Sequence, residues 1–319
     1  MTVATALLQQ DSPSLTMVET VVRRAMKRAQ SPRAEAILLF VTSDFAHDLP
    51  QVVHTAARTG QTLQVHGCSA IGVMTEEDWV IDGPAVAAMV WADEPGLTAT
   101  HDGNTAHVAL AAPNAINRLW LESPNPRYGG VSGDATGHGP YTVWGSGRMA
   151  DIGHIEAGWA GYTADWHLSQ ALTPLSAWQT VTASQGFDLL HLDSGPAADG
   201  LLKRLAQSGI SLQTPHLLAW LSTGDAVPVL NIDLQRGAVS LARPLALGEQ
   251  LRWALRTEAA ALADLQQALS GQAPPDFMLH FASAGRGPNL HQGRDAEWDR
   301  ITRHFPDTPL IGFYGNGEI

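Results

Sequence analysis

Short apolar runs of strand length alternate along this chain with stretches whose apolar residues recur at helical spacing. The runs at Ala34–Ser43, Thr62–His66 and Pro84–Trp91 predict buried strands. Apolar residues within Thr16–Arg28 and Leu49–Arg58 fall near every third or fourth position, which predicts helices with one buried face. Because strands and helices alternate, we expect a mixed α/β (α+β) fold.

The same two patterns extend toward the C-terminus. We expect helices at Ala106–Trp120, Pro196–Gln207, Thr257–Leu269 and Asp295–His304. We expect strands at Tyr141–Trp144, His154–Ala157 and Trp159–Tyr162, within 176–194, and at Val227–Asp233, Ala238–Leu241 and Phe277–Ser283. The stretch 123–139 is rich in glycine and contains two prolines, which predicts a long functional loop.

One order of elements occurs twice. Residues Ile37–Gly72 and Phe277–Gly317 both read as strand, helix and strand, and both end in two glycines five positions apart. A repeat of this size predicts two related modules. Because glycine lets the backbone approach a ligand closely, we expect two glycine loops that enclose a small-ligand site between the modules.

Charge and cysteine usage narrow the classes of function. The formal net charge is −12 and the only basic run is 23–28, which argues against a nucleic-acid partner. Cys68 is the single cysteine, so an intrachain disulfide is excluded and a reducing compartment is favoured. The first residues lack a basic region typical of a signal peptide, and no apolar run is long enough for a membrane helix. We therefore expect a cytoplasmic protein without a membrane partner.

Several segments, taken in order, resemble FIST-domain proteins. They are Gly67–Gly72, Tyr128–Asp134, Val181–Gly186, Leu192–Ala197, Phe281–Gly287 and Pro309–Ile319. The resemblance covers about residues 34 to 319. It implies an extension at 1–33, a FIST N-terminal domain at 34–200 and a FIST C-terminal domain at 201–319.

The resemblance implies a bacterial sensory, ligand-binding protein of signal transduction, with amino acids among the proposed ligands and a histidine kinase or another signalling protein as partner. One subclass of the family binds haem and senses nitric oxide. The sequence departs from the family in two places. Val73 follows Gly72 where a glutamate is usual, and Ser283 with its neighbours replaces a usual cysteine. Family members usually continue a little beyond the position of Ile319.

Arg286 is the residue best suited to bind an acidic group. It lies in a glycine-rich turn after a strand, where amides favour anions and a guanidinium matches a carboxylate or phosphate. Glu318 would pair with Arg286 or take a ligand amine; the alternatives are a surface arginine and a solvated carboxylate. The predicted ligand-binding residues are Gly67, Cys68, Ser69, Gly72, Ser283, Arg286, Tyr314, Gly315, Asn316, Gly317 and Glu318.

Two alternatives use other residues. A hydrolase or transferase would use Cys68 as nucleophile and His66 as base, although a small buried cysteine is the commoner role. A haem-binding nitric-oxide sensor would need one axial histidine in an apolar pocket, for which the candidates are His138, His154, His167 and His216. We expect a non-catalytic protein without a cofactor and keep both alternatives open.

Overall fold

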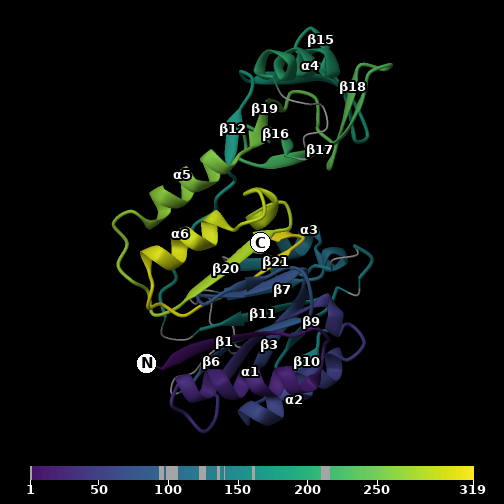
Figure 1. The fold of residues 1–319 in the computed structure, drawn as a ribbon. Helices are drawn as coiled ribbons and strands as arrows, with labels where there is room; N and C mark the ends of the chain where they lie inside the picture. Colours follow the sequence, from purple (N-terminus) through teal and green to yellow (C-terminus); the bar gives the residue numbers. More distant parts are fainter. Residues whose placement is uncertain are drawn as a thin grey trace. The chain divides into compact units, whose positions relative to one another are not determined.

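The computed structural model describes residues 2–92, 97, 107–121, 127–134, 137–139, 141–159, 162–209 and 216–319. These residues form two compact units (Figure 1). Unit 1 comprises 1–166, 273–289 and 298–319, and unit 2 comprises 167–272 and 290–297. The predicted boundary at 200/201 coincides with neither unit, because the strands after residue 273 complete sheets that begin in the first half of the chain.

Unit 1 contains most of the helices and strands of the described residues. They are β1 Val3–Gln9, α1 Leu15–Arg28, β2 Ala36–Thr42, a 3₁₀ turn Ser43–Phe45, α2 Leu49–Gly60, β3 Val65–Ala70, β4 Gly72–Thr75, β5 Trp79–Val80, β6 Ala85–Trp91, β7 His107–Ala111, a 3₁₀ turn Pro113–Ala115, α3 Arg118–Leu121, β8 Arg127–Val131, β9 Val143–Gly145, β10 Arg148–Met149, β11 His154–Gly158, β20 Met278–Ser283, a 3₁₀ turn Gly287–Asn289, α6 Ala296–His304, β21 Leu310–Gly315 and β22 Gly317–Glu318. Helix α6 begins in the stretch 290–297, which clusters with unit 2.

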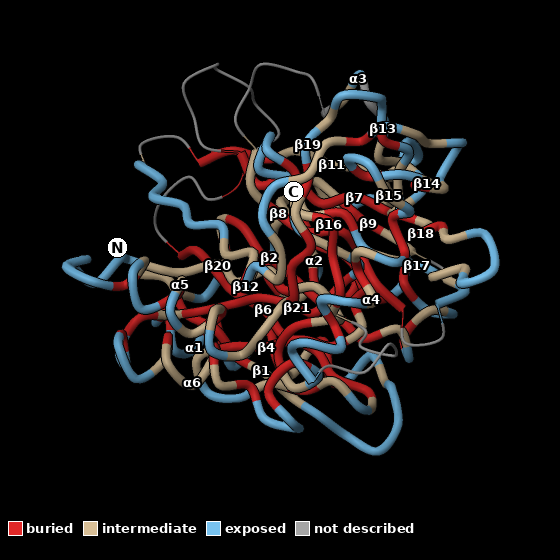
Figure 2. The backbone as a smooth tube through the Cα atoms, turned by 90° about the horizontal axis from the view of Figure 1, so that it is seen from above, coloured by how far each residue is buried: buried red, intermediate tan, exposed pale blue. Residues whose placement is uncertain are grey.

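The central sheet of unit 1 has the strand order β1-β6-β2-β3-β9-β10. Strand β2 is buried along its whole length, because its alternate side chains enter two different cores (Figure 2). Ile37 and Leu39 pack with helices α1 and α2, whereas Leu38 and Phe40 pack with strands from the other end of the chain. This explains why β2 reads as a continuous apolar run rather than an alternating one.

Three parallel strand pairs form the frame of unit 1: β2 with β3, β7 with β8, and β20 with β21. In each pair, the second strand carries a glycine so close to its partner that a Cβ atom would lie within 2 Å of a backbone carbonyl oxygen. The glycines are Gly67, Gly129 and Gly312. The repeat found in the sequence is therefore present, and a third pair with the same glycine accompanies it.

The ends of these second strands connect the three pairs into a closed ring. Strand β3 runs on into β4, which pairs with β21. Strand β21 runs on into β22, which pairs with β8. Beyond β8, the amide of Gly133 donates to the carbonyl of Ser69 at the end of β3, over 3.2 Å.

Unit 2 is built around one sheet that closes on itself, since β16 pairs with both β17 and β19. Its core contains Trp253 of β19 and Leu201 of α4. The elements are β12 Leu172–Pro174, β13 Gln179–Gln185, β14 Asp188–Leu192, β15 Gly195–Pro196, α4 Ala197–Ser208, β16 Leu217–Leu221, β17 Ala226–Asp233, β18 Ala238–Leu241, β19 Gln250–Arg256 and α5 Glu258–Leu269. Helix α5 begins where the Thr257 hydroxyl accepts a hydrogen bond from the amide of Ala260.

The mixed α/β fold predicted from the sequence is confirmed. The predicted glycine loops are wrong, because both segments are strands. The segment from Gly67 lies in β3 and β4, and the segment from Ile311 to Gly315 lies in β21. The glycines allow close contact between two backbones within a sheet instead of a turn. None of the helices in the described part of the chain is long and apolar enough to cross a membrane.

The predicted helix Ala106–Trp120 is also wrong. Residues His107–Ala111 form β7, and only Arg118–Leu121 is α-helical, because pairing with β8 overrides the helix preference of the alanines. The predicted loop 123–139 contains strand β8, while 123–126 and 135–136 lie outside the described residues. The predicted strand Trp159–Tyr162 includes 160–161, which also lie outside them.

Candidate functional site

The structure brings the two glycine segments of the repeat together within unit 1. Gly72 of β4 is the register partner of Tyr314 of β21. Ser283 at the end of β20 is opposite Gly315, and its amide donates to the Glu318 carboxylate over 2.8 Å. Residues predicted from distant parts of the sequence therefore meet at one end of the parallel strand pairs.

The backbone amides of this region are mostly engaged within the protein. The amide of Ser69 donates to the Thr142 carbonyl, and that of Ile71 donates to the Tyr314 carbonyl, each over 2.9 Å. The Asn316 amide donates to the carbonyl of Val131, also over 2.9 Å. These amides are used in strand pairing, so the side chains are the better candidates for ligand contacts.

We use the term strand-end junction for Ser69, Ser132, Gly133, Asp134, Ser283, Arg286, Gly315, Asn316 and Glu318. The three second strands meet there. The Asn316 side-chain amide donates to the Ser132 carbonyl over 2.9 Å. A Cβ atom on Gly133 would lie 3.0 Å from Cα of Gly315, so two strand ends touch at these glycines. Asn316 and Glu318 are exposed, so the junction reaches the surface.

Two buried hydroxyls at the junction have no hydrogen-bond partner among the residues that the structure describes. They are Oγ of Ser132, which is fully buried, and Oγ of Ser283. A buried polar group without a partner costs about 1–3 kcal/mol, so it is uncommon in a native protein. Because each hydroxyl can both donate and accept, the two groups are suited to bind a polar ligand.

Arg286 follows Ser283 by three residues and is buried, with 6% of its surface exposed. Its amide donates to the Ser283 carbonyl over 2.8 Å, which makes the chain turn immediately after β20. The Asn289 side chain donates to the Ala284 carbonyl and holds the same turn. A guanidinium at this position can bind a carboxylate or phosphate through two parallel hydrogen bonds.

Asp134 is the second buried charge of the junction, with 6% of its surface exposed. Its Oδ2 atom accepts hydrogen bonds from the amides of His138 and Gly139, each over 3.0 Å. The carboxylate thereby fixes the chain after β8.

The environment of Cys68 is unsuited to a nucleophile. Its side chain is fully buried in β3, and this burial raises the pKa of the thiol well above its usual value. Burial also lowers the pKa of His66 to about 4, opposed by a hydrogen bond from the ring to the backbone of Leu97. The reactive form of cysteine is the thiolate, so the structure disfavours the alternative that uses Cys68.

The histidines considered for haem are dispersed. His138 and His167 are exposed, and His154 stacks on Trp120 with ring centroids 4.6 Å apart. Burial, together with the charge of Arg256, lowers the pKa of His216. Within the described ranges, no group of three or more His, Cys, Asp or Glu side chains could hold a metal ion. Binding of haem through one axial histidine stays an untested alternative.

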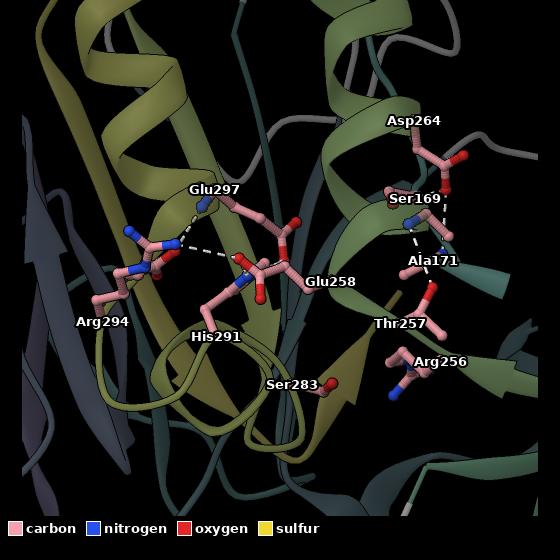
Figure 3. Close-up of polar contacts among 12 residues, drawn as sticks. Ser169, Ala171, Arg256, Thr257, Glu258, Asp264, Ser283, His291, Arg294 and Glu297 are labelled. Atoms are coloured by element: carbon pink, nitrogen blue, oxygen red, sulfur yellow. Dashed lines mark hydrogen bonds and ion pairs between the residues drawn. The ribbon is translucent and has the colours of Figure 1, made fainter. Parts of the chain in front are cut away.

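A buried histidine cluster in unit 2 has no counterpart in the sequence predictions. His291 Nε2 lies 3.1 Å from a carboxylate oxygen of Glu297, and Nδ1 lies 3.6 Å from one of Glu258 (Figure 3). Arg294 pairs with the same Glu258 oxygen over 3.3 Å. Burial lowers the pKa of His291, but Glu297, Glu258 and Asp295 raise it more, so the net shift is upward. Glu258 is distant in sequence, so no local motif could reveal this cluster.

A surface hollow of about 610 Å³ lies elsewhere in unit 1, between the C-terminal ends of α1 and α2. Arg23, Lys27 and Arg58 line it, and none of its lining residues belongs to the strand-end junction. Basic residues in the last turn of a helix offset the partial negative charge of the helix end. That role accounts for Lys27 and Arg58 without a ligand.

Comparison with known proteins identifies one domain. A family model described as FIST C domain matches residues 203–319, from within α4 to the last residue. No curated protein matches the chain. The matched region includes Ser283, Arg286 and Glu318 of the strand-end junction. Residues 203–319 are therefore similar to the FIST C domain.

Proposed function

We propose that this chain is a non-catalytic sensory protein that binds a small anionic or zwitterionic ligand, such as an amino acid, at the strand-end junction. The FIST C domain supports the sensory role. The observation that carries the ligand site is the pair of buried hydroxyls without partners, Ser132 and Ser283, next to the buried Arg286. A ligand would satisfy groups that the protein leaves unsatisfied.

The residues of the junction have distinct roles in this proposal. Arg286 binds the acidic group of the ligand, and the hydroxyls of Ser132 and Ser283 complete its hydrogen bonds. Glu318 takes the ligand amine with Oε2, since Oε1 accepts a hydrogen bond from the Ser283 amide. Contacts from Asn316 and Gly317 stay predictions, as do those from Ser69, Gly72, Tyr314 and Gly315. Gly67 and Cys68 lie inside β3, where contact with a ligand is the least favoured.

We also propose that the first half of the chain holds the N-terminal FIST module expected at 34–200. The supporting observation is that β2, α2 and β3 follow the same order as β20, α6 and β21, with parallel strands in both. In this proposal, binding of the ligand alters docking to a signalling protein such as a histidine kinase. Such a switch requires that the ligand binds two states of the protein with different affinity.

Calorimetric titration of the full chain with each common L-amino acid tests the ligand site. We expect at least one amino acid to bind, and Arg286→Ala to weaken that binding about 30-fold or more through loss of a charge-assisted contact. Ser132→Ala and Ser283→Ala should each weaken it less.

Arg303→Ala is the matched control, because Arg303 is exposed on α6 and pairs only with Asp299 among the described residues. It should bind like the unmodified chain. The proposal fails if the folded chain binds none of these amino acids, or if Arg286→Ala retains full affinity.

A further inference from the structure

An arginine of unit 2 contacts the rings of two tryptophans. Arg252 of β19 places its guanidinium carbon 3.7 Å from the ring centre of Trp220 and 4.7 Å from that of Trp178. The two indole rings are 6.4 Å apart. We call Trp178, Trp220 and Arg252 the Trp–Arg–Trp platform.

The platform lies on the outer face of the unit 2 sheet. Trp220 and Arg252 are register partners on adjacent strands. Their chain neighbours Leu221, Leu251 and Trp253 point the other way, into the core. Since successive side chains of a strand face opposite sides, the platform faces away from the core. Trp178 is 44% exposed, which is unusual for an indole without a function at the surface.

The outer face continues as an apolar surface along β17. Pro228 is exposed, and Leu230 has 65% of its surface exposed. Their neighbours Val227 and Val229 pack into the core instead, so the two exposed residues share the side of the sheet that carries Trp220. The platform therefore combines one cation with apolar surface on a neighbouring strand.

The charge of Arg252 is not compensated by a carboxylate. In the described part of the chain, Arg252 has no ion pair and no hydrogen bond, and its Nε atom is buried without a partner. Other arginines of unit 2 do have carboxylates: Arg236 pairs with Asp188, and Arg243 pairs with Glu249. In a chain of net charge −12, an arginine that contacts two indoles and has no carboxylate partner among the described residues is suited to bind an external anion.

We propose that the Trp–Arg–Trp platform docks an extended acidic segment of a partner protein. A glutamate or aspartate of the segment binds the terminal N–H groups of Arg252, which have no partner among the described residues and, unlike Nε, are not buried. Apolar residues beside that acid lie on Trp178 and on the β17 surface. A protein segment fits better than a small molecule because the surface is open, and because tryptophan and arginine dominate the binding energy of protein interfaces.

Binding of two labelled peptides to the full chain tests this surface. One peptide alternates glutamate with proline and leucine, and the other has glutamine in place of each glutamate. We expect the glutamate peptide to bind at least about tenfold more tightly at low ionic strength, and the difference to shrink when salt is raised. Because the chain itself is acidic, it repels an acidic peptide in general. Without a specific site, the glutamine peptide would therefore bind more tightly.

Variants locate the binding. Arg252→Gln and Trp178→Ala should each weaken binding of the glutamate peptide at least about tenfold. Arg236→Gln is the matched control, an exposed arginine of the same unit, and should bind like the unmodified chain. Trp178 is exposed enough that its replacement leaves the fold intact, so it decides the outcome if Arg252→Gln fails to fold.

Fluorine NMR of the chain labelled with 5-fluorotryptophan supplies a direct readout. The resonances of Trp178 and Trp220, assigned by replacing each with phenylalanine, should shift on addition of the glutamate peptide. A purely structural stacking role would change stability only. The proposal is overturned if the glutamate peptide does not bind at about 1 mM, if both variants bind normally, or if only other tryptophans shift.

Discussion

Gly312 lies against His280 so closely that a Cβ atom on Gly312 would be 1.9 Å from the carbonyl oxygen of His280. The corresponding distance is 1.7 Å between Gly67 and the Leu39 carbonyl oxygen. In both parallel pairs, the two residues are register partners. The shared geometry ties the two glycines to one structural requirement, which is close packing of one backbone on another.

Replacing either glycine by alanine should therefore destabilise unit 1 strongly. We expect Gly67→Ala and Gly312→Ala each to reduce the free energy of unfolding by about 3 kcal/mol or more, because a backbone cannot move aside as a side chain can. Gly200→Ala is the control, since Gly200 lies within helix α4 and its Cβ atom would meet nothing closer than 4.0 Å. Chemical denaturation should show that this variant is unchanged or slightly stabilised. Wild-type stability of Gly312→Ala would contradict the close contact.

Cys68 should be unreactive in the folded protein. Burial raises the pKa of its thiol, so the thiolate is scarce near neutral pH, and the side chain has no exposed surface. Labelling with iodoacetamide should be negligible in buffer and complete in denaturant, as followed by mass spectrometry. Cys68→Ser should abolish labelling in both conditions. Native labelling at the rate of a free thiol would restore the alternative of a cysteine nucleophile.

His66 should make the protein less stable in mild acid. Its pKa is 6.5 when unperturbed and about 4 in the folded protein, where burial disfavours the charged ring. The unfolded chain therefore takes up more protons between these values, and stability is lost as the pH falls from 6.5 to about 4. The full difference corresponds to about 3 kcal/mol. We expect His66→Gln to reduce this loss in denaturation curves measured across that range; an unchanged pH dependence would contradict it.

His291 should have the opposite effect on the pH dependence of stability. Its folded pKa lies above the ordinary value, despite burial, because Glu297, Glu258 and Asp295 favour the charged ring. The stabilisation is complete below about pH 6.5 and is lost as the pH rises through the folded pKa. Arg294, which pairs with Glu258, limits the effect. The protection factors of the α5 amides against hydrogen exchange should fall above this pH in the unmodified chain but not in His291→Gln.

Part of the fold follows from patterns that are local in sequence. The apolar run that includes Ile37 to Val41 predicts a buried strand, which is β2, and the helix predicted at Thr257–Leu269 is α5. The strand β7 could not be predicted in this way. Its alanines favour a helix, and only pairing with β8, across a segment outside the described residues, makes His107–Ala111 a strand.

Part of the candidate site could also be expected from the sequence. The repeat predicts that the two glycine segments come together, and the structure brings Gly72 beside Tyr314 and Ser283 beside Glu318. Nothing in the sequence identified Ser132, because the lack of a partner for a hydroxyl is a property of packing alone. The sequence analysis did not predict the third strand pair, β7 with β8. It therefore did not predict that β8 supplies one side of the strand-end junction.

The pairing of β21 with β4 and of β22 with β8 limits where the chain can be divided into fragments that fold. A fragment restricted to the matched region 203–319 would contain β21 without its partner β4, and β22 without its partner β8. The edges of β21 and β22 would then have unpaired backbone groups and be prone to aggregation. A chimaera that uses this region therefore requires the strands from both halves of the chain. Recombination between relatives should tolerate crossovers at 166/167 and 272/273 better than one near residue 203.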